Sequence, residues 1–593
     1  MSSEEYAQER WSLDELFPAL DSTEIEDAIK ALEAQIASFE ELRDRLSAEL
    51  DPETFAEALD KYDQMSRLIS RLSAYAHFKF TEDTQDQAAH TFQARTHQLG
   101  AELDNRTMFF KLWWKALEDD GAEALMGAAG DYRYWLEALR LEKPYTLSEP
   151  EEKVINIKDV NGSAALRTLY DSITNRYTFP LEVNGEVKDL TRGELMVYVK
   201  SPEAAVRAAA YQSLFKVYEK DVPILGQIYQ YRARDWSSEN VRLREYSSPI
   251  AVRNLNNDLP DDLVDMMLEI SKENAILYQR YFRLKAKWMG MDKLQRYDVY
   301  APVVKTEKTY SFAESAEVVL ASFNKFEPKV AELARKLFDE HHIDSEVRSG
   351  KMTGAYCSTV EPDLTPWVMQ NFQGRPDDVA TMAHELGHAI HSLLAADHSA
   401  LTQGSSLPLA ETASTFSEML LMDELLERDP DPEVRRDLLF RQMDDSFATI
   451  QRQAFFAMFE KTAFELIESG ASVDDLTSAY WENLKAQFGD SLELNDEFKY
   501  EWSMIPHFHM APFYVYAYAF GQLLVLSLYK QYREEGDSFK PRYLEILSAG
   551  GSDSPVRILD RAGIDVTSRD FWNGGFQVVE EALQQLEAMP VVT

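Results

Sequence analysis

Hydrophobic residues recur at helical spacing along most of this chain. From Ser22 to about Glu118, leucine and alanine repeat at intervals of three and four among charged residues, as over 24–46 and 52–80. The same pattern returns at about Arg192 and continues through Trp288. This spacing places the apolar side chains on one face of each helix. The sequence therefore predicts a mainly α-helical protein.

Two regions depart from the helical pattern. Residues 177–187 contain Asn184 followed by Gly185, a pair that favours the tight turn of a β-hairpin. Residues 299–304 and 367–372 are short apolar or aromatic runs near proline and glycine, which predicts strands of a small sheet. We expect the second strand to be an edge at which an extended peptide pairs through its main chain.

The segment 381–391 contains the pattern H-E-x-x-H. On a helix, His384 and His388 lie on one face about one turn apart and can bind a single zinc ion. Asp377 and Asp378 follow Pro376 and provide a helix start, and apolar residues then recur at helical spacing. Glu385 is next to the first histidine, where its carboxylate can take a proton from an attacking water. The motif predicts a metalloprotease.

A catalytic zinc needs a third protein ligand and one open position. Positions 391 and 394 hold histidine and leucine, which excludes the spacing typical of metzincins. A second helix, predicted over 408–421, carries Glu411 and Glu418 on one face, two turns apart. We predict Glu411 as the third ligand of one zinc ion per chain. Glu418 is predicted to orient one of the histidine ligands.

The residues around these two motifs together resemble the thimet-oligopeptidase family, specifically its oligoendopeptidase F branch. The resemblance extends over nearly the whole chain and includes residues 11–17, 297–302, 354–357 and 371–374. It implies a multi-helix, two-lobed zinc peptidase that encloses a deep channel, with a small β-sheet beside the zinc helix. It also implies an intracellular endopeptidase that acts on short peptides.

The chain is expected to divide near residue 190. Residues 1–190 form an N-terminal helical region that includes the predicted β-hairpin, and residues 191–593 form the catalytic metallopeptidase domain. No repeat of fixed period and no low-complexity linker marks another boundary.

A second group of candidate residues lies in the segment 505–520. Peptide hydrolysis builds negative charge on the former carbonyl oxygen, which histidine or tyrosine donors stabilise. The resemblance implies this role for His507 and Tyr514, although the chain lacks the glycine-rich loop that thimet relatives carry between these two residues. The other rings of the segment remain alternatives as substrate-binding residues: His509, Tyr516 and Tyr518.

Residues 511–529 contain no charged side chain and have the length of a membrane span. Pro512, Gly521 and Gln522 interrupt this run, and four tyrosines lie within it. These features favour a buried helix rather than a membrane helix.

Charge and cysteine content limit the partners and the compartment. With 61 basic and 102 acidic residues the net charge is −41, which argues against nucleic acid or anionic membrane as a partner. The N-terminus lacks the basic and apolar parts of a signal peptide. The single cysteine, Cys357, cannot form an internal disulfide and fits a reducing cytoplasm, where we expect the protein to act on short peptides. The sequence leaves the oligomeric state open.

Two other classes of protein compete with a zinc endopeptidase. A metallocarboxypeptidase or dipeptidyl carboxypeptidase on a similar scaffold needs a cation that holds the terminal carboxylate of its substrate. A non-catalytic peptide-binding protein has no need of the general base Glu385. We therefore favour an endopeptidase that works by direct water attack, with no covalent intermediate.

Overall fold

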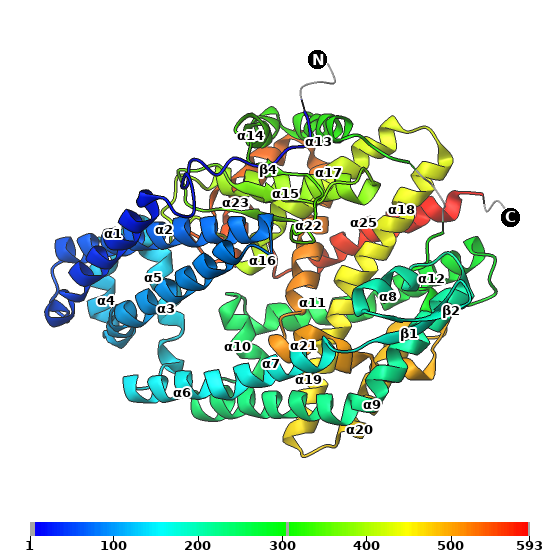
Figure 1. Cartoon of the computed structure of the whole chain (residues 1–593), viewed down its shortest axis with the longest axis horizontal. Coiled ribbons are helices and arrows are strands. Elements are labelled where there is room, and N and C mark those ends of the chain that lie inside the picture. Colours follow the sequence, from blue (N-terminus) through cyan, green and yellow to red (C-terminus); the bar gives the residue numbers. More distant parts are fainter. Residues whose placement is uncertain (1–5, 304–307, 591–593) are drawn as a thin grey trace. The chain divides into compact units, whose positions relative to one another are not determined.

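The computed structural model describes residues 6–303 and 308–590, and most of these residues lie in helices (Figure 1). This confirms the mainly α-helical fold that the hydrophobic spacing predicts. By its internal contacts the chain separates into two compact units. Unit 1 consists of Met1–Lys143, Glu307–Arg428 and Gln531–Asp565, and unit 2 consists of Pro144–Thr306, Asp429–Lys530 and Val566–Thr593. The boundary near residue 190 divides the chain differently and stays a prediction.

The first part of unit 1 is a group of packed helices with an aromatic core. Its helices are α1 (Thr23–Glu40), α2 (Pro52–Glu82), α3 (Gln87–Ala116), α4 (Asp119–Met126) and α5 (Arg133–Leu141), with the short turn η2 (Gly130–Tyr132) before α5. At the start of α2, Asp51 accepts a hydrogen bond from the backbone N–H of Thr54 at 2.9 Å, and Pro52 takes the first helical position. The core of this group includes Phe39, Phe55, Tyr62, Phe110 and Trp114.

The second part of unit 1 contains the elements that follow residue 307. They are α13 (Phe312–Phe326), α14 (Pro328–Asp339), β4 (Ile343–Asp344), β5 (Tyr356–Ser358), β6 (Trp367–Met369), α15 (Pro376–Leu394), α16 (Leu407–Ala410), α17 (Thr412–Arg428), α23 (Lys540–Ser548) and α24 (Pro555–Arg561). Helix α15 packs against α13, α14 and α17. It also contacts β5 and β6, so the small sheet lies directly beside it.

The small sheet corrects two predictions about strands. Its order is β4–β6–β5, with β6 parallel to β4 and antiparallel to β5. The strand expected near 367–372 therefore exists but is central, and its three residues are all buried, as is usual for a central strand. The edge strands of this sheet are β4 and β5. The other expected strand is wrong, because Val299 and Tyr300 form a turn and residues 301–303 are not in a strand; Val304 lies outside the described residues.

Unit 2 is also built mainly of helices. Its first half contains α6 (Glu149–Asn161), α7 (Ser163–Thr174), β1 (Phe179–Val183), β2 (Glu186–Leu190), α8 (Arg192–Val199), α9 (Ala204–Trp236), α10 (Pro249–Asn256), α11 (Asp261–Glu273), α12 (Ala275–Trp288) and β3 (Leu294–Gln295). Strands β1 and β2 form the predicted hairpin. Asn184 and Gly185 have φ of 55° and 82°, the positive values that this two-residue turn requires.

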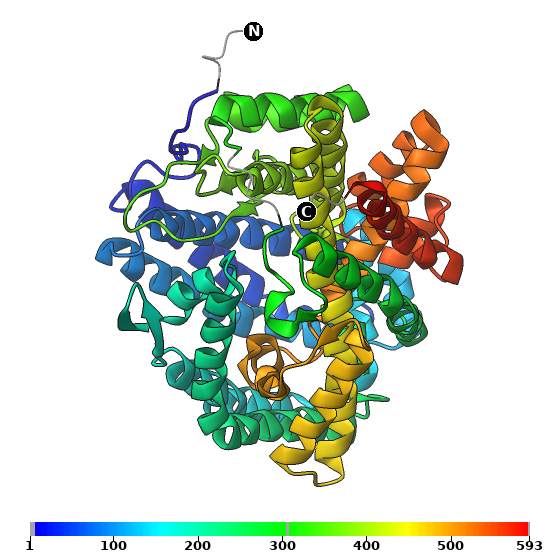
Figure 2. The ribbon, with the colours of Figure 1, turned by 90° about the vertical axis from the view of Figure 1, so that its right-hand side faces the viewer.

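The second half of unit 2 contains α18 (Pro432–Ser446), α19 (Arg452–Glu468), α20 (Val473–Phe488), β7 (Leu492–Glu493), α21 (Pro506–Met510), α22 (Tyr516–Glu535) and α25 (Arg569–Ala588). A π-helical turn joins α18 to α19, so the chain stays helical from Pro432 to Glu468 (yellow in Figure 2). Strand β7 pairs with β3. Helix α22 continues beyond Lys530 into unit 1.

The uncharged run 511–529 does not form a single helix. Helix α21 ends at Met510 and α22 begins only at Tyr516, with most of the apolar residues of α22 buried. Over residues 6–303 and 308–590, no helix is both long and apolar enough to cross a membrane.

Candidate functional site

Helix α15 presents the H-E-x-x-H residues from a firmly capped start. Asp378 accepts hydrogen bonds from the backbone N–H groups of Gln373 and Arg375 at 2.8 and 3.0 Å. This is the capping role that the sequence predicts for one of the two aspartates. The opposite face of α15 is buried, whereas the side chains of His384 and His388 are 28% and 26% exposed. The two histidines therefore lie on the open face of the helix.

Glu411 lies at a break between two helices. Helix α16 ends at Ala410 and α17 begins at Thr412, so the single helix predicted over 408–421 is interrupted at this glutamate. The hydroxyl of Ser414 donates a hydrogen bond to Oε2 of Glu411 at 2.7 Å. The carboxylate is thus held by the first turn of the helix that follows it.

Close packing of α15 on α17 brings the two motifs together. Gly387 lies between the two histidines in the sequence and has no side chain to separate the helices. A Cβ atom at this position would lie 2.5 Å from Cα of Ser414 and 2.7 Å from the carbonyl oxygen of Ala413. Only glycine permits this approach of the two backbones.

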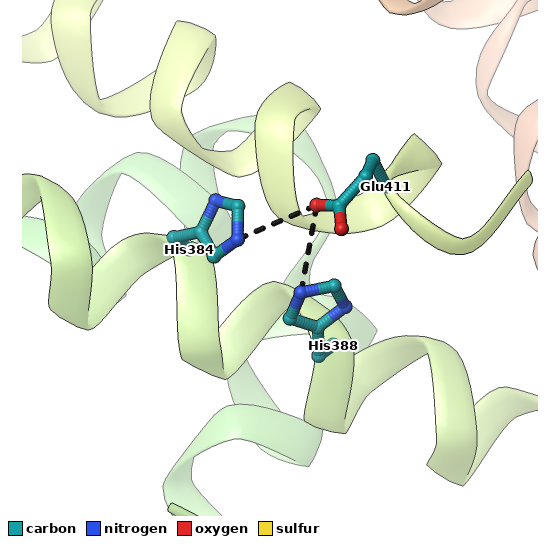
Figure 3. A group of neighbouring side chains, drawn as sticks. All are labelled: His384, His388 and Glu411. Atoms are coloured by element: carbon teal, nitrogen blue, oxygen red, sulfur yellow. Dashed lines mark ion pairs between the residues drawn. The ribbon is translucent and has the colours of Figure 1, made fainter. Parts of the chain in front are cut away.

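His384, His388 and Glu411 converge on one point (Figure 3). Oε2 of Glu411 lies 3.4 Å from Nε2 of His384 and 3.5 Å from Nε2 of His388. A tetrahedral zinc ion with ligands at about 2.1 Å would place neighbouring ligand atoms about 3.4 Å apart. The three side chains therefore have the chemistry and the spacing of a metal site.

Glu418 contacts the far side of the His384 ring. Its Oε1 lies 2.5 Å from Nδ1 of His384, which leaves Nε2 of that ring directed toward Glu411. Burial lowers the pKa of His384, but the hydrogen bond to Glu418 and the nearby carboxylates outweigh burial and raise this pKa to about 9. The sequence-based prediction that Glu418 lies beside a histidine of the motif is confirmed in its geometry.

Glu385 opens onto a cavity of about 410 Å³ within unit 1. Its side chain is 6% exposed, and burial raises its pKa to about 7. A carboxyl group with a pKa near neutrality is well matched to accept and release a proton. The cavity is lined by α15, by the loop before α16 and by residues of β5 and its flanks: Ala355, Tyr356, Cys357 and Thr359.

Cys357 and His391 are two further residues of the cavity. Cys357 is the only cysteine, and desolvation raises the pKa of its thiol well above the usual value, which favours an inert thiol. His391 lines the cavity, is 7% exposed and has no partner for Nε2 among the described residues. The sequence analysis did not predict His391 as a residue of the site. Its position about one turn beyond His388 on the same helix indicates that it lies near the metal-binding residues.

The aromatic segment of unit 2 separates into exposed and buried rings. His507, Tyr514 and Tyr518 are partly exposed and contact one another. The rings of His507 and Tyr514 are nearly parallel, with centroids 5.9 Å apart. The Tyr518 hydroxyl lies 3.3 Å from Nε2 of His507. These three rings form one cluster in unit 2, whereas the histidine–glutamate group belongs to unit 1.

His509 and Tyr516 do not fit the predicted role as substrate-binding residues. His509 is fully buried and stacks on the ring of Tyr170, with centroids 3.9 Å apart. Tyr516 is fully buried as well, and its hydroxyl accepts a hydrogen bond from Asn257 at 2.9 Å. A side chain without exposed surface cannot contact a substrate, so the structure corrects the prediction for both residues.

Comparison with known families agrees with the geometry of the site. The model of peptidase family M3 matches residues 197–578 and therefore includes the histidines, Glu411 and the aromatic segment. The model described as oligopeptidase F matches residues 113–179.

Individual relatives cover most of the chain. Group B oligopeptidase PepB of Streptococcus agalactiae is 30% identical over 88% of this chain and 88% of its own length. Oligopeptidase PepF of Bacillus subtilis is 27% identical over 99% of this chain and 88% of its own length. The crystal structure of oligoendopeptidase-F from Enterococcus faecium has a TM-score of 0.72 and 23% identity, covering 96% of this chain and 99% of that one. The last match shows a shared fold.

Proposed function

The chain belongs to peptidase family M3, and we propose that it is a zinc-dependent endopeptidase that hydrolyses internal bonds of short, unstructured peptides. The observation that carries this proposal is the convergence of His384, His388 and Glu411 beside the buried carboxyl group of Glu385. Two neutral nitrogen donors and one carboxylate oxygen are the ligand set of many catalytic zinc sites.

We assign His384, His388 and Glu411 as the residues that would hold the ion. When bound, zinc polarises a peptide carbonyl group and lowers the pKa of water. Glu418 keeps a proton on Nδ1 of His384, so that the lone pair of Nε2 is free for the ion.

Glu385 is the proposed general base. Water attacks the carbonyl carbon of the scissile bond while the Glu385 carboxylate takes its proton. As the carbon–nitrogen bond breaks, the same carboxyl group returns the proton to the leaving amine. The pKa of about 7 supports both steps, because the group is neither too weak a base nor too weak an acid at neutral pH.

His507 and Tyr514 are proposed to donate hydrogen bonds to the carbonyl oxygen as it becomes negative. Burial, and then the charge of Arg452, lower the pKa of His507, so its ring is neutral at neutral pH and carries one N–H donor. The Tyr514 hydroxyl has no hydrogen-bond partner among the described residues and is free to donate. The resemblance to oligoendopeptidase F supports this assignment.

Substrate pairing is reassigned from β6 to β5. As an edge strand, β5 has backbone groups that another strand can reach, and its residues line the cavity next to Glu385. We propose that an extended peptide pairs with this edge through main-chain hydrogen bonds, which depend little on its side chains. The enclosed channel remains an implication of the family resemblance. The cytoplasmic location and the absence of nucleic-acid and membrane partners remain expectations from the net charge, the N-terminus and the single cysteine.

The proposal is tested with the purified protein and a quenched fluorescent peptide of about eight residues. Chelation should abolish cleavage, and zinc should restore it. Glu385→Gln should keep the metal and lower turnover by about 10²-fold or more. Unchanged cleavage by Glu385→Gln, or full activity in a preparation free of metal, would show that the proposed chemistry is wrong.

A further inference from the structure

Arg253 is a half-buried cation beside the ring cluster of unit 2. It lies on α10, and its Nε donates a hydrogen bond to the carbonyl oxygen of Pro512 at 3.1 Å. Its guanidinium carbon lies 5.9 Å from the centroid of the Tyr514 ring. These two contacts fix the plane of the guanidinium group next to Tyr514.

The terminal nitrogens of Arg253 have no partner within the described parts of the chain. No carboxylate there forms an ion pair with Arg253, and Nε is the one hydrogen-bonded atom of its guanidinium group. Two other half-buried arginines of unit 2 differ: Arg244 pairs with Glu152 and Glu239, and Arg280 pairs with Glu580 and Glu587. In a chain with 102 acidic and 61 basic residues, an unpaired and half-buried arginine is unexpected.

An acid that interacts electrostatically with Arg253 does not neutralise it. Glu460 is fully buried and accepts a hydrogen bond from the backbone N–H of Phe513 at 3.1 Å. Burial raises the pKa of Glu460 to about 8, so this carboxyl group is largely protonated at neutral pH. Arg253 therefore keeps an uncompensated positive charge.

The backbone next to Tyr514 is held in an uncommon conformation. Phe513 has φ of 59°, in the left-handed region that non-glycine residues seldom adopt. Arg253 holds the carbonyl oxygen before this residue, and Glu460 accepts from its N–H group. The loop thus keeps Tyr514 and the guanidinium group in a fixed relation, which removes most of the cost of ordering them when a ligand binds.

We propose that Arg253 binds a carboxylate group of the peptide substrate. A guanidinium group offers two parallel N–H donors that match the two oxygens of a carboxylate. The carboxylate can be the C-terminus of the peptide or the side chain of an aspartate or glutamate. This inference rests on the proposed peptidase function and adds a residue that selects among peptides.

The test uses one eight-residue quenched peptide in four versions. The C-terminus is free or amidated, and one position carries either glutamate or glutamine. All four are assayed with the unmodified protein, Arg253→Gln and Arg253→Lys. Arg234→Gln is the matched control, because Arg234 is an exposed arginine of unit 2 that lies over the ring of Tyr231, and its loss removes the same charge.

The unmodified protein should cleave at least one carboxylate-bearing version with a kcat/KM at least about tenfold above that for the neutral version. Arg253→Gln should remove this preference through KM, so that its kcat/KM values for the carboxylate-bearing and neutral versions differ by less than about twofold. Arg253→Lys should retain part of the preference, and Arg234→Gln all of it. The peptide version whose kcat/KM falls in Arg253→Gln identifies which carboxylate Arg253 binds.

Equal efficiency of the unmodified protein on all four peptides would overturn the inference without the use of any variant. An equal loss on all four peptides in Arg253→Gln, expressed in kcat, would overturn it as well, because that result means that Arg253 only supports Pro512 and Tyr514. Neither result affects the proposed peptidase function. The proposed peptidase function is contradicted separately if the unmodified protein cleaves none of the four peptides.

Discussion

Oε1 of Glu418 lies 2.5 Å from Nδ1 of His384. Since a carboxylate can only accept, the contact holds a proton on Nδ1, so Nε2, which faces Glu411 at 3.4 Å, is the nitrogen of this ring that can bind an ion. The two glutamates of the second motif therefore act on opposite sides of one ring. This arrangement distinguishes a ligand from a residue that orients a ligand.

The first prediction concerns the different effects of these two glutamates on metal binding. Glu411→Ala should abolish stoichiometric metal binding, whereas Glu418→Ala should weaken it by about 10–100-fold, because only the orientation of His384 is lost. Metal content and zinc titration of the purified variants measure this. Glu427→Ala, an exposed position on the same helix, is the control. Stronger loss in Glu418→Ala than in Glu411→Ala would reverse the assignment.

The second prediction concerns the contact between α15 and α17. Gly387→Ala should destabilise the protein by about 1–3 kcal/mol or force the helices apart, because the new methyl group meets backbone atoms rather than movable side chains. Separation of the helices would also lower zinc affinity. Gly121→Ala on α4 is the control, since nothing lies within 4 Å of its added Cβ. Denaturant unfolding and metal content together decide the outcome, and equal stability of both variants would contradict it.

The third prediction separates two neighbouring tyrosines. Tyr514→Phe should lower kcat by about tenfold or more and leave the unfolding temperature unchanged, because its hydroxyl bonds to nothing in the described structure. Tyr516→Phe should cost about 1–2 kcal/mol of stability, because buried Asn257 loses its partner. Steady-state kinetics and thermal unfolding of the pair test this. A drop in kcat confined to Tyr516→Phe would show that the oxyanion donor is misassigned.

The fourth prediction is a pH dependence of stability that arises from His398 and Asp131. Nδ1 of His398 donates to Asp131 at 2.7 Å, and Nε2 donates to the carbonyl oxygen of Ser548 at 3.0 Å. Both partners only accept, so both ring nitrogens carry protons and the ring is charged. The hydrogen bond to Asp131 raises the pKa of His398. The pKa of Asp131 is lowered, because its hydrogen bonds outweigh the opposite effect of burial.

A raised pKa in the folded state stabilises the protein fully below the unfolded value of about 6.5, and this stabilisation is lost as the pH rises through the folded pKa. The lowered pKa of Asp131 has the opposite effect on the pH dependence: the stabilisation that Asp131 contributes is lost only in acid. His398→Gln should therefore cost about 1–2 kcal/mol at pH 6 and clearly less at pH 9. Urea unfolding at both pH values measures this, with the exposed His97→Gln as control. A cost in His398→Gln that does not change with pH would contradict a charged ring.

The fifth prediction is a limit on substrate size. A peptide that pairs with β5 through its backbone must be extended, which a folded domain cannot provide. We expect cleavage of short peptides and no cleavage of native lysozyme, with intact casein cut slowly or not at all. Gel electrophoresis and mass spectrometry of the products measure this. Rapid degradation of casein that is blocked in Glu385→Gln would contradict the size limit.

The sequence was sufficient for features that depend on near neighbours. The start of α15, the Asn184–Gly185 hairpin and the position of His384 one turn before His388 all follow from spacing and local hydrogen bonding. It was insufficient where an apolar run fits more than one environment. Residues 299–303 have strand-like composition but form a turn and irregular backbone, and residues 367–369 form a central strand rather than an edge.

The sequence by itself determined that the chain is helical and which residue types stand at metal-binding spacing, because helical periodicity and the H-E-x-x-H motif are local properties. Only the tertiary structure decided which polar groups meet and which are buried. Gly387 packs against the backbone of Ser414, and His509 is buried against the ring of Tyr170. Both contacts join residues that are far apart in the chain. Such contacts depend on how whole helices pack, and a pattern read along one helix carries no information about the surface that will cover it.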